Sequence, residues 1–217
     1  MVNSNSVEGA NRVKFGLKRR GLLVHDIDWS GLSKSLKILG EVGCAPVGGD
    51  GGRAGNVALR TKGGLIVSRS NRSNLVLKRE DFVEIVGFSR AKWEVCYLSM
   101  REDIIPTSDT PLYWLALVEM SRKMRWSHCP QVAIHGHALE MEEAAAKLGI
   151  PISRKETEFS TPEDYEAFSE LLSSHPYPEH KIFIRKGHGF FILGESIEEI
   201  NDLTLRTISE GRRLQIL

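Results

Sequence analysis

The stretch KIFIRKGHGFFILGESIEEI, residues 181–200, carries several structural signals in succession. Two apolar runs lie on either side of Gly187-His188-Gly189, which predicts two strands joined by a tight glycine turn. Ser196 and Glu199 then have the spacing of a capping box, in which two side chains accept hydrogen bonds from backbone N–H groups at a helix start. The stretch therefore predicts a pair of strands that passes directly into a helix.

Strand and helix signals are mixed along the rest of the chain. The sequence VALRTKGGLIVS, residues 57–68, predicts a β-hairpin that turns at its two glycines. A cap residue followed by proline predicts helices that begin near Pro111 and Pro162, and we expect the first of them to run to about Lys123. This mixture predicts a layered α/β domain with a mixed or largely antiparallel sheet. The alternation of strand and helix is too irregular for a Rossmann unit.

The composition is that of an ordinary globular protein, with 41% hydrophobic and 26% charged residues in a chain of 217. A formal net charge of +1 gives no electrostatic reason to expect nucleic acid or an anionic membrane as a partner. No apolar run approaches the roughly 20 residues that a membrane-spanning helix needs. The first residues lack the apolar core of a secretory signal. We therefore expect no membrane and no nucleic-acid partner.

The cysteines and the N-terminal residues bear on compartment and domain organisation. Cys44, Cys96 and Cys129 are widely spaced and form neither a CxxC pair nor an even disulfide framework, which favours a reducing, cytoplasmic setting. The basic sequence NRVKFGLKRRG is more typical of a solvated tail or face than of a nucleic-acid-binding arm. We expect residues 1–20 to form a basic, partly flexible segment and residues 21–217 to form one domain.

The sequence QVAIHGHALE, residues 131–140, ends an apolar run with two histidines one residue apart. Residues i and i+2 of a strand point to the same face, so His135 and His137 can converge on one ion. Imidazole suits zinc and similar divalent ions, and a catalytic zinc usually has three protein ligands. The competing interpretation is two ordinary histidines bonded to backbone groups near the surface.

A metal site with a chemical role needs a third ligand and a carboxylate. His188, in the glycine turn, is the candidate ligand, and a turn histidine with no ligand role is the alternative. Asp109, in PTSDTP, is the leading carboxylate, while Glu119 and Glu140 have weaker sequence contexts. Asp109 also fits a simpler role as the N-cap of the helix that follows it.

The sequence GGDGGRAGN, residues 48–56, is too rich in glycine to form regular structure. The backbone N–H groups of such a loop can surround an anion. Further donors and charges are available in Ser68, Ser70, Thr107, Ser108, Arg53 and Arg69. The loop is not a Walker loop, because no GK[ST] follows it. A mobile loop without a ligand remains the alternative.

The order of these motifs resembles that of the class II aldolase/adducin head family, which includes the zinc-dependent fuculose phosphate and rhamnulose phosphate aldolases. The matching segments, in chain order, are AGNVALR, GGLIVS with NLVLKREDFVEI, PTSDTP, HGH and IRKGHGFFILGESIEEI. They extend from about Gly52 to the C-terminal helix. The resemblance implies a three-layer α/β/α sandwich around a central, largely antiparallel mixed sheet.

The resemblance also implies roles for individual residues. The metal ligands would be His135, His137 and His188, with one divalent ion per chain, expected to be Zn²⁺. The catalytic acidic residue would be Asp109. The phosphate-binding residues would be Gly55, Asn56, Ser70, Thr107 and Ser108. The family further implies a homotetramer with its site near the subunit interfaces and a small sugar phosphate as substrate.

The implied activity is that of a metal-dependent lyase, which cleaves a phosphorylated ketose by retro-aldol chemistry through a metal-stabilised enediolate. Two departures from the family keep other reactions open. Asp109 stands where the aldolases usually carry glutamate, and SDTP is similar to the ribulose-phosphate 4-epimerase branch, whose further acidic and tyrosine residues have no counterpart here. Arg69 and Ser70 replace a common Thr-Gly pair, so Arg69 could contact a phosphate or a carboxylate. An epimerase, dehydratase or decarboxylase, or a non-catalytic adducin-head-like assembly domain, are the alternatives.

Overall fold

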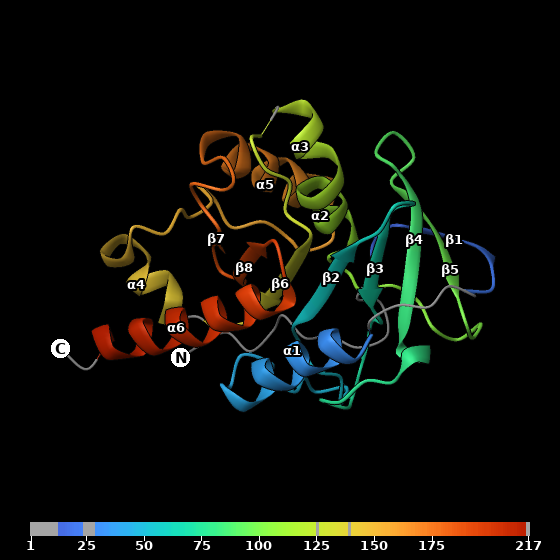
Figure 1. Cartoon of the computed structure of the whole chain (residues 1–217), viewed down its shortest axis with the longest axis horizontal. Helices are drawn as coiled ribbons and strands as arrows, with labels where there is room; N and C mark the ends of the chain where they lie inside the picture. The colour runs from blue at the N-terminus through green and yellow to red at the C-terminus, as the bar shows by residue number, and fades with distance from the viewer. Residues whose placement is uncertain (1–12, 24–28, 125, 139, 216–217) are drawn as a thin grey trace.

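An eight-stranded sheet forms the centre of the computed structural model, which describes residues 13–23, 29–124, 126–138 and 140–215 (Figure 1). The strand order is β1-β5-β4-β3-β2-β6-β8-β7. Neighbouring strands are antiparallel except for the edge pair β1 and β5, which is parallel. The strands are β1 (Gly16–Gly21), β2 (Asn56–Arg60), β3 (Leu65–Ser68), β4 (Phe82–Ser89), β5 (Glu94–Ser99), β6 (Val132–Gly136), β7 (Ile182–Arg185) and β8 (Gly189–Gly194).

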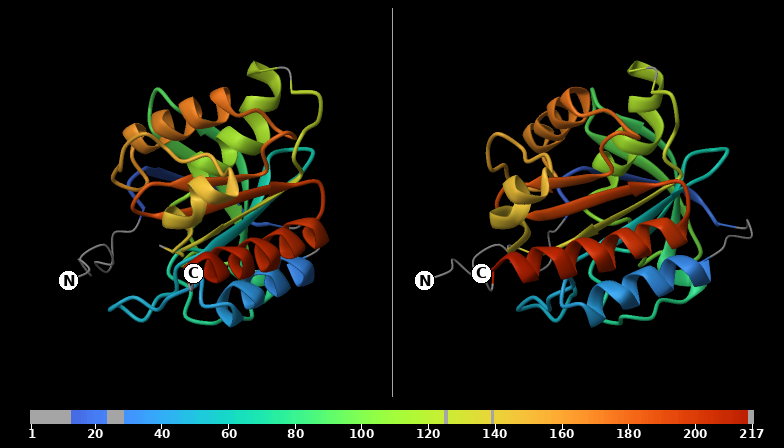
Figure 2. Two further views of the ribbon diagram at one scale, coloured as in Figure 1. Left: turned by 90° about the vertical axis from the view of Figure 1, so that its left-hand side faces the viewer. Right: turned by 60° about the vertical axis from the view of Figure 1, so that its left-hand side comes forward.

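Helices cover both faces of the sheet, which confirms the predicted three-layer α/β/α sandwich (Figure 2). One layer contains α1 (Trp29–Glu41), α4 (Glu140–Leu148) and α6 (Ile197–Gln215), and the opposite layer contains α2 (Thr110–Trp114), η2 (Leu115–Glu119), α3 (Met120–Lys123) and α5 (Pro162–Ser174). A short 3₁₀ turn, η1 (Arg79–Asp81), precedes β4. Each layer encloses its own apolar core against the sheet. In the part of the chain that the structure describes, no helix is both long and apolar enough to cross a bilayer.

The local signals in the sequence explain most element boundaries. Helix α5 begins after Thr161, whose side chain accepts a hydrogen bond from the N–H of Asp164, as expected of an N-cap. Helix α6 begins after Ser196, whose hydroxyl accepts from the N–H of Glu199. The predicted capping box is wrong in one detail, because the Glu199 carboxylate accepts from the N–H of Glu195 instead of that of Ser196.

Two segments differ in part from what their sequences predict. The helix that was predicted from Pro111 to about Lys123 does end at Lys123, but its middle turn, Leu115–Glu119, is a π-helix. Of the predicted N-terminal segment, residues 1–12 lie outside the described residues, and the last residues enter strand β1, which pairs with β5. Its basic side chains are therefore on an edge strand of the sheet.

The central strands bring the site residues together. In the antiparallel pair of β2 and β6, Asn56 lies opposite His135, and in the pair of β6 and β8, Gly136 lies opposite Phe190. A Cβ on Gly136 would come within 2.5 Å of the Phe190 ring, so only glycine fits between the two histidines. A Cβ on Gly189 would lie 2.3 Å from the carbonyl oxygen of Gly136, which keeps the turn that carries His188 against the end of β6.

The β2–β3 hairpin provides a stability prediction with a matched control. A Cβ on Gly64 would lie 1.9 Å from the carbonyl oxygen of Ile85, whereas a Cβ on Gly63 has no neighbour closer than 3.7 Å. We expect Gly64→Ala to lower the free energy of unfolding by about 1–3 kcal/mol, because the backbone of β4 must move. Gly63→Ala should change it by less than about 0.5 kcal/mol. Chemical denaturation of both variants tests this, and equal stabilities would contradict the close approach of β3 and β4.

Candidate active site

Three histidines converge where β6 ends and the β7–β8 turn crosses it. One potential ligand nitrogen from each of His135, His137 and His188 lies within 4.8 Å of the others. The Nε2 atoms of His135 and His137 are 3.1 Å apart. The rings of His135 and His188 stack with centroids 5.1 Å apart. Three imidazoles in one small volume are a donor set that suits zinc and similar divalent ions.

The environment of His135 fixes which of its nitrogens faces the cluster. Its side chain is fully buried, and its Nδ1 lies 2.8 Å from the carbonyl oxygen of Phe190. Because a carbonyl only accepts, Nδ1 carries the proton and donates, which leaves the lone pair of Nε2 directed towards His137. A backbone carbonyl behind the imidazole is the usual support of a metal-binding histidine. Of the competing interpretation, the backbone hydrogen bond of His135 is present, but its position near the surface is wrong because the residue is fully buried.

Two of the histidines are held in the uncharged form that binds metals. Burial lowers the pKa of His135, and the positive charge of Arg185 lowers it further, while Asp109 acts in the opposite direction. Burial also holds the pKa of His188 well below its ordinary value, and Arg185 and the other two histidines add to this shift. Neutral imidazoles at pH 7 can bind a divalent ion without first releasing a proton.

Asp109 lies beside the histidine cluster and is almost completely buried. One oxygen, Oδ1, accepts from Nη1 of Arg185 at 2.9 Å, and the other, Oδ2, accepts from Nδ2 of Asn56 at 2.7 Å. Oδ2 is also 3.9 Å from Nε2 of His135. Although Asp109 occupies the N-cap position of α2, its side chain makes no capping hydrogen bond, so the simpler cap role is wrong.

The charges around Asp109 keep it ionised. Burial alone raises the pKa of its carboxyl, but the positive charge of Arg185 and the hydrogen bond from Asn56 oppose this effect, and the net shift of the pKa is below the ordinary value of 3.8. Asn56 is itself fixed, because its side-chain oxygen accepts from the Tyr113 hydroxyl at 2.6 Å. A buried carboxylate with two fixed donors can accept a proton from a bound molecule without first changing its orientation.

Arg185 connects Asp109 to a second buried carboxylate, that of Asp164 at the start of α5. The Arg185 side chain is almost fully buried, and its Nε and Nη2 donate to the two oxygens of Asp164. Asp164 also accepts from Thr157 Oγ1 at 3.0 Å and from the N–H of Ser160 at 3.2 Å. This network joins Asp109 to the segment that carries Phe159, whose ring stacks on His188.

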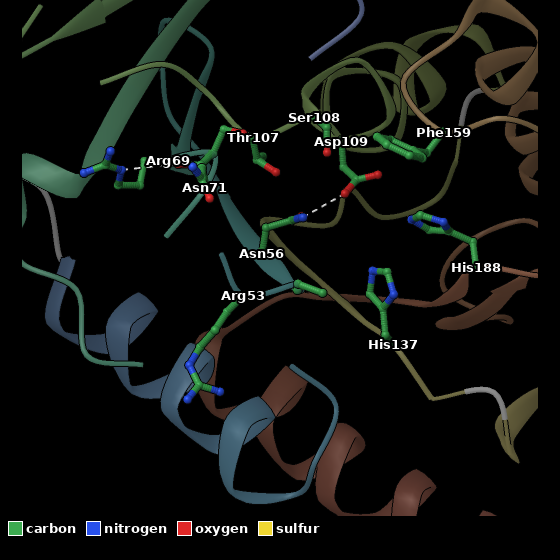
Figure 3. Close-up of a pocket in the computed structure, with 13 residues that line it drawn as sticks. Arg53, Asn56, Arg69, Asn71, Thr107, Ser108, Asp109, His137, Phe159 and His188 are labelled. Carbon is green, nitrogen blue, oxygen red and sulfur yellow. Dashed lines mark hydrogen bonds between the residues drawn. The ribbon is translucent and has the colours of Figure 1, made fainter. Parts of the chain in front are cut away.

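A pocket opens beside the cluster (Figure 3). Asp109, His137 and His188 are at one end, and Thr107 and Asn71 are at the other. The side chains that line it are mostly small and polar, and the lining includes Gly55, Asn56, Ser70, Asn71, Thr107, Ser108, Asp109, His137, Phe159 and His188.

The structure brings together every residue to which the family resemblance gives a role. Eight of them line the pocket, namely Asp109, His137, His188, Gly55, Asn56, Ser70, Thr107 and Ser108. The ninth, His135, is adjacent to the pocket, with its Nε2 atom 3.1 Å from that of His137. The weaker carboxylate candidate Glu119 is elsewhere, because it accepts from Tyr165 and pairs with Lys123. The side chain of Glu140 lies outside the described residues.

Arg69 and Arg53 border the pocket, but their guanidinium groups turn away from it (Figure 3). Arg69 pairs with Asp81 at 3.4 Å and donates to the carbonyl of Ser70. Arg53 donates to the carbonyls of Ser73 and Ala45. In this structure the charge of Arg69 therefore points towards Asp81, and its contact with a phosphate or a carboxylate stays a prediction.

Several residues of the site were not predicted, namely Arg185, Asp164, Asn56 as a partner of Asp109, Arg72, Asn71, Phe159 and Tyr113. Arg185 has a visible signal in the sequence, since it is a charge at the end of the apolar run IFI and must find a partner if that strand is buried. The partner itself, Asp109, is 76 positions away and follows only from the fold. Phe159 and Asn71 lie in loops and have no periodic signal.

The arrangement of strands and helices around this site is that of the class II aldolases. The L-fuculose-1-phosphate aldolase from Thermus thermophilus is similar over 87% of this chain and 92% of its own, with a TM-score of 0.60 and 18% identity. A sugar-phosphate aldolase from Thermotoga maritima covers 84% of this chain and 91% of its own, with a TM-score of 0.63 and 13% identity.

A third similar structure is YgbL from Klebsiella pneumoniae, provisionally described as an aldolase/epimerase/decarboxylase. It covers 86% of this chain and 87% of its own, with a TM-score of 0.59 and 14% identity. No family model matches the sequence, and no curated protein matches it. At these identities the comparisons establish the fold that the motif order predicted.

Proposed function

We propose that this protein is a divalent-metal-dependent lyase that cleaves a phosphorylated ketose, or a related small phosphorylated sugar derivative, by a retro-aldol reaction. The observation that carries the proposal is the position of the buried Asp109 carboxylate beside three converging histidines at one end of a polar pocket. The neighbouring structures of sugar-phosphate aldolases support the same class of substrate.

The residues present fit a divalent ion. His135, His137 and His188 would hold it, and Zn²⁺ is the ion that three neutral imidazoles favour most directly. Such an ion, when bound, supplies a Lewis acid for the carbonyl and hydroxyl oxygens of the substrate. The hydrogen bond between His135 and the Phe190 carbonyl would keep one ligand in a fixed orientation.

Asp109 would act on the proton of the reacting hydroxyl group. Retro-aldol cleavage removes that proton as the C–C bond breaks, and the fragment that keeps the electrons later takes up a proton at carbon. Asp109 is ionised at neutral pH and faces the histidines, so it can accept the hydroxyl proton as a general base. Arg185 and Asn56 would keep the carboxylate in position during this transfer.

The far end of the pocket would bind the phosphate group. Gly55, Ser70, Thr107 and Ser108 would supply amide and hydroxyl donors, whereas the side-chain amide of Asn56, the fifth predicted phosphate ligand, already donates to Asp109. Among the described residues, the backbone N–H groups of Gly55, Asn71 and Ser108 donate to no protein acceptor, so they are available to an anion. Fixing the phosphate would place the reacting carbons beside Asp109.

A second candidate is an epimerase, dehydratase or decarboxylase that uses the same histidines. The observation that favours it is the short Asp109 side chain in SDTP, since the class II aldolases that the sequence resembles usually carry glutamate there. A non-catalytic assembly domain is a weaker candidate, because it has no physical need for three converging histidines beside an ionised, buried carboxylate. We further propose a cytoplasmic homotetramer, in keeping with the three free cysteines and the resembling family.

Metal content is the direct test of this proposal. We expect protein purified without a nickel column to carry, or to take up, about one divalent ion per chain by elemental mass spectrometry. With that ion bound, a screen of ketose phosphates should reveal cleavage that a chelator abolishes and added metal restores. A protein that neither contains nor takes up a divalent ion would refute the metal-dependent lyase and favour the assembly domain.

The products separate the two enzymatic candidates. A lyase splits the sugar phosphate into an aldehyde and a smaller ketone fragment, whereas an epimerase returns a sugar phosphate of the same mass. Mass spectrometry of the reaction mixture distinguishes these results. Metal-dependent turnover without a change of mass would replace the lyase by the epimerase.

A further inference from the structure

Arg72 is a buried cation behind the loop that forms one wall of the pocket. Only 2% of this residue is exposed, and it is among the largest fully buried side chains of the described structure. Its guanidinium donates to the carbonyls of Ala54 at 2.9 Å, Gly55 at 3.2 Å and Asn74 at 3.0 Å. Its own carbonyl accepts from the N–H of Arg53 at 2.6 Å. Arg72 therefore joins the glycine loop to the segment that carries Ser70 and Asn71.

The charge of Arg72 has no carboxylate partner among the residues that the structure describes. All of its acceptors are backbone carbonyls, whereas the buried Arg185 is paired with two carboxylates. Burial lowers the pKa of Arg72 to about 10, and Arg53 contributes to the shift, so the group is still charged at neutral pH. A buried charge without a counter-ion is unfavourable. An anion bound in the adjacent pocket would relieve that cost.

The hydrogen bonds of Arg72 also set the direction of the amides that face the pocket. In a trans peptide the C=O and the following N–H point in opposite directions. Because Arg72 holds the carbonyl of Ala54, the N–H of Gly55 points away from the guanidinium, and it has no protein acceptor among the described residues. Gly55 and Asn71 both have positive φ, at 78° and 50°, a conformation found where successive amides form an anion-binding concavity.

The two arginines that border the pocket do not direct their charges into it. The guanidinium groups of Arg53 and Arg69 turn away from the pocket, and Arg69 is paired with Asp81 (Figure 3). The donors that remain at this end are amides and hydroxyls, which carry no net charge. Arg72 differs from both because its guanidinium is bonded to the carbonyls of Ala54 and Gly55, so its charge lies directly behind the amides of that loop.

We propose that Arg72 is a positioning residue for a doubly charged phosphate: it orients the amides of the 54–56 loop and supplies the positive charge of the phosphate end without touching the ligand. This inference rests on the proposed function for the location of the phosphate. It extends that function by naming the residue whose charge recognises the phosphate. A carboxylate would gain less from such a site, because it carries one charge and has fewer acceptor oxygens.

The test measures inorganic phosphate binding by calorimetry at about pH 8, with the metal-loaded full-length protein. We expect Arg72→Gln to weaken phosphate binding by about 10- to 100-fold, which is the loss typical of a charge-assisted interaction. Arg72→Lys keeps the charge but lacks the planar fork that holds the carbonyls, so it should lose less, about three- to tenfold. Arg69→Gln, which removes the same formal charge from a group that points away, should change the affinity by less than about threefold.

Two further measurements distinguish a positioning role of Arg72 from a general loss of structure. Metal content and near-ultraviolet circular dichroism should match the wild type in all three variants, and Arg72→Lys serves as the test if Arg72→Gln does not fold. On an active ketose phosphate, Arg72→Lys should raise KM and leave kcat within about threefold, because the metal end is intact.

Several outcomes would overturn the inference. It is refuted if folded Arg72→Gln or Arg72→Lys binds phosphate as tightly as the wild type, or if Arg69→Gln loses as much affinity as Arg72→Gln. A wild-type protein that binds no phosphate also refutes it. By contrast, phosphate binding that depends on Arg72 in a protein that turns over no ketose phosphate would support the inference while the proposed lyase function fails.

Discussion

His188→Ala should lose its bound metal and remain folded. His188 supplies one of three converging nitrogens, and the two that remain cannot hold a divalent ion against dilution or a mild chelator. We expect the affinity to fall by more than the roughly 10- to 100-fold that loss of an outer-shell partner costs. Elemental mass spectrometry on the dialysed variant, with circular dichroism as the folding control, makes the measurement.

The matched control is His128→Ala. His128 is exposed and lies in a loop, where its ring contacts only Ser127 among the interactions described for it. This variant should keep the metal content of the wild type. If His188→Ala also keeps one ion per chain, His188 is not a ligand, and the interpretation as an ordinary turn histidine returns.

Asp109→Asn should keep the metal and lose turnover by about 10²- to 10⁴-fold, the usual range for removal of a general base. The amide has the size of the carboxylate but cannot accept the hydroxyl proton. Metal content and kcat on the same preparation separate binding from chemistry. Full activity in this variant would leave Asp109 with a purely structural role.

The pH dependence of kcat in the wild-type protein gives a second test of the role of Asp109. The pKa of Asp109 lies below its ordinary value of 3.8, so this base stays ionised as the pH falls through the neutral and mildly acidic range. If kcat decreases as the pH is lowered towards about 5, the group that takes up the proton should therefore not be Asp109. The stability that the ionised carboxylate contributes is present above the unfolded pKa and is lost only as the pH falls towards the lower folded value.

The sequence, together with the family resemblance, predicted the layered α/β fold and nine residues that the structure brings together at one pocket. Alternating apolar runs, the glycine turn at His188 and the cap-then-proline pattern depend on local chemistry, so they predicted strands β2, β3, β7 and β8 and the start of α5. The ordered motifs suggested the residues that the pocket gathers. Their roles as metal and phosphate ligands remain predictions.

The partners of buried charged side chains could not be predicted from local sequence patterns. Arg185 and Asp109 meet because β7 and the start of α2 approach each other across the fold, and nothing near either residue indicates the other. Arg72 gave no signal because its acceptors are backbone carbonyls, which every residue has. The π-helical turn at Leu115–Glu119 likewise reflects packing, since its sequence LALVE fits an ordinary α-helix.

The sharing of Arg185 between Asp109 and Asp164 limits how this protein can diverge. A glutamate at position 109 would push one more methylene towards a guanidinium that is already bound on both sides. A neutral residue at position 164 would leave the almost fully buried Arg185 with a single counter-ion. We therefore expect positions 109, 164 and 185 to covary, because a tolerated substitution at one of them requires a substitution at another. Relatives that carry the longer acid are expected to lack this arginine.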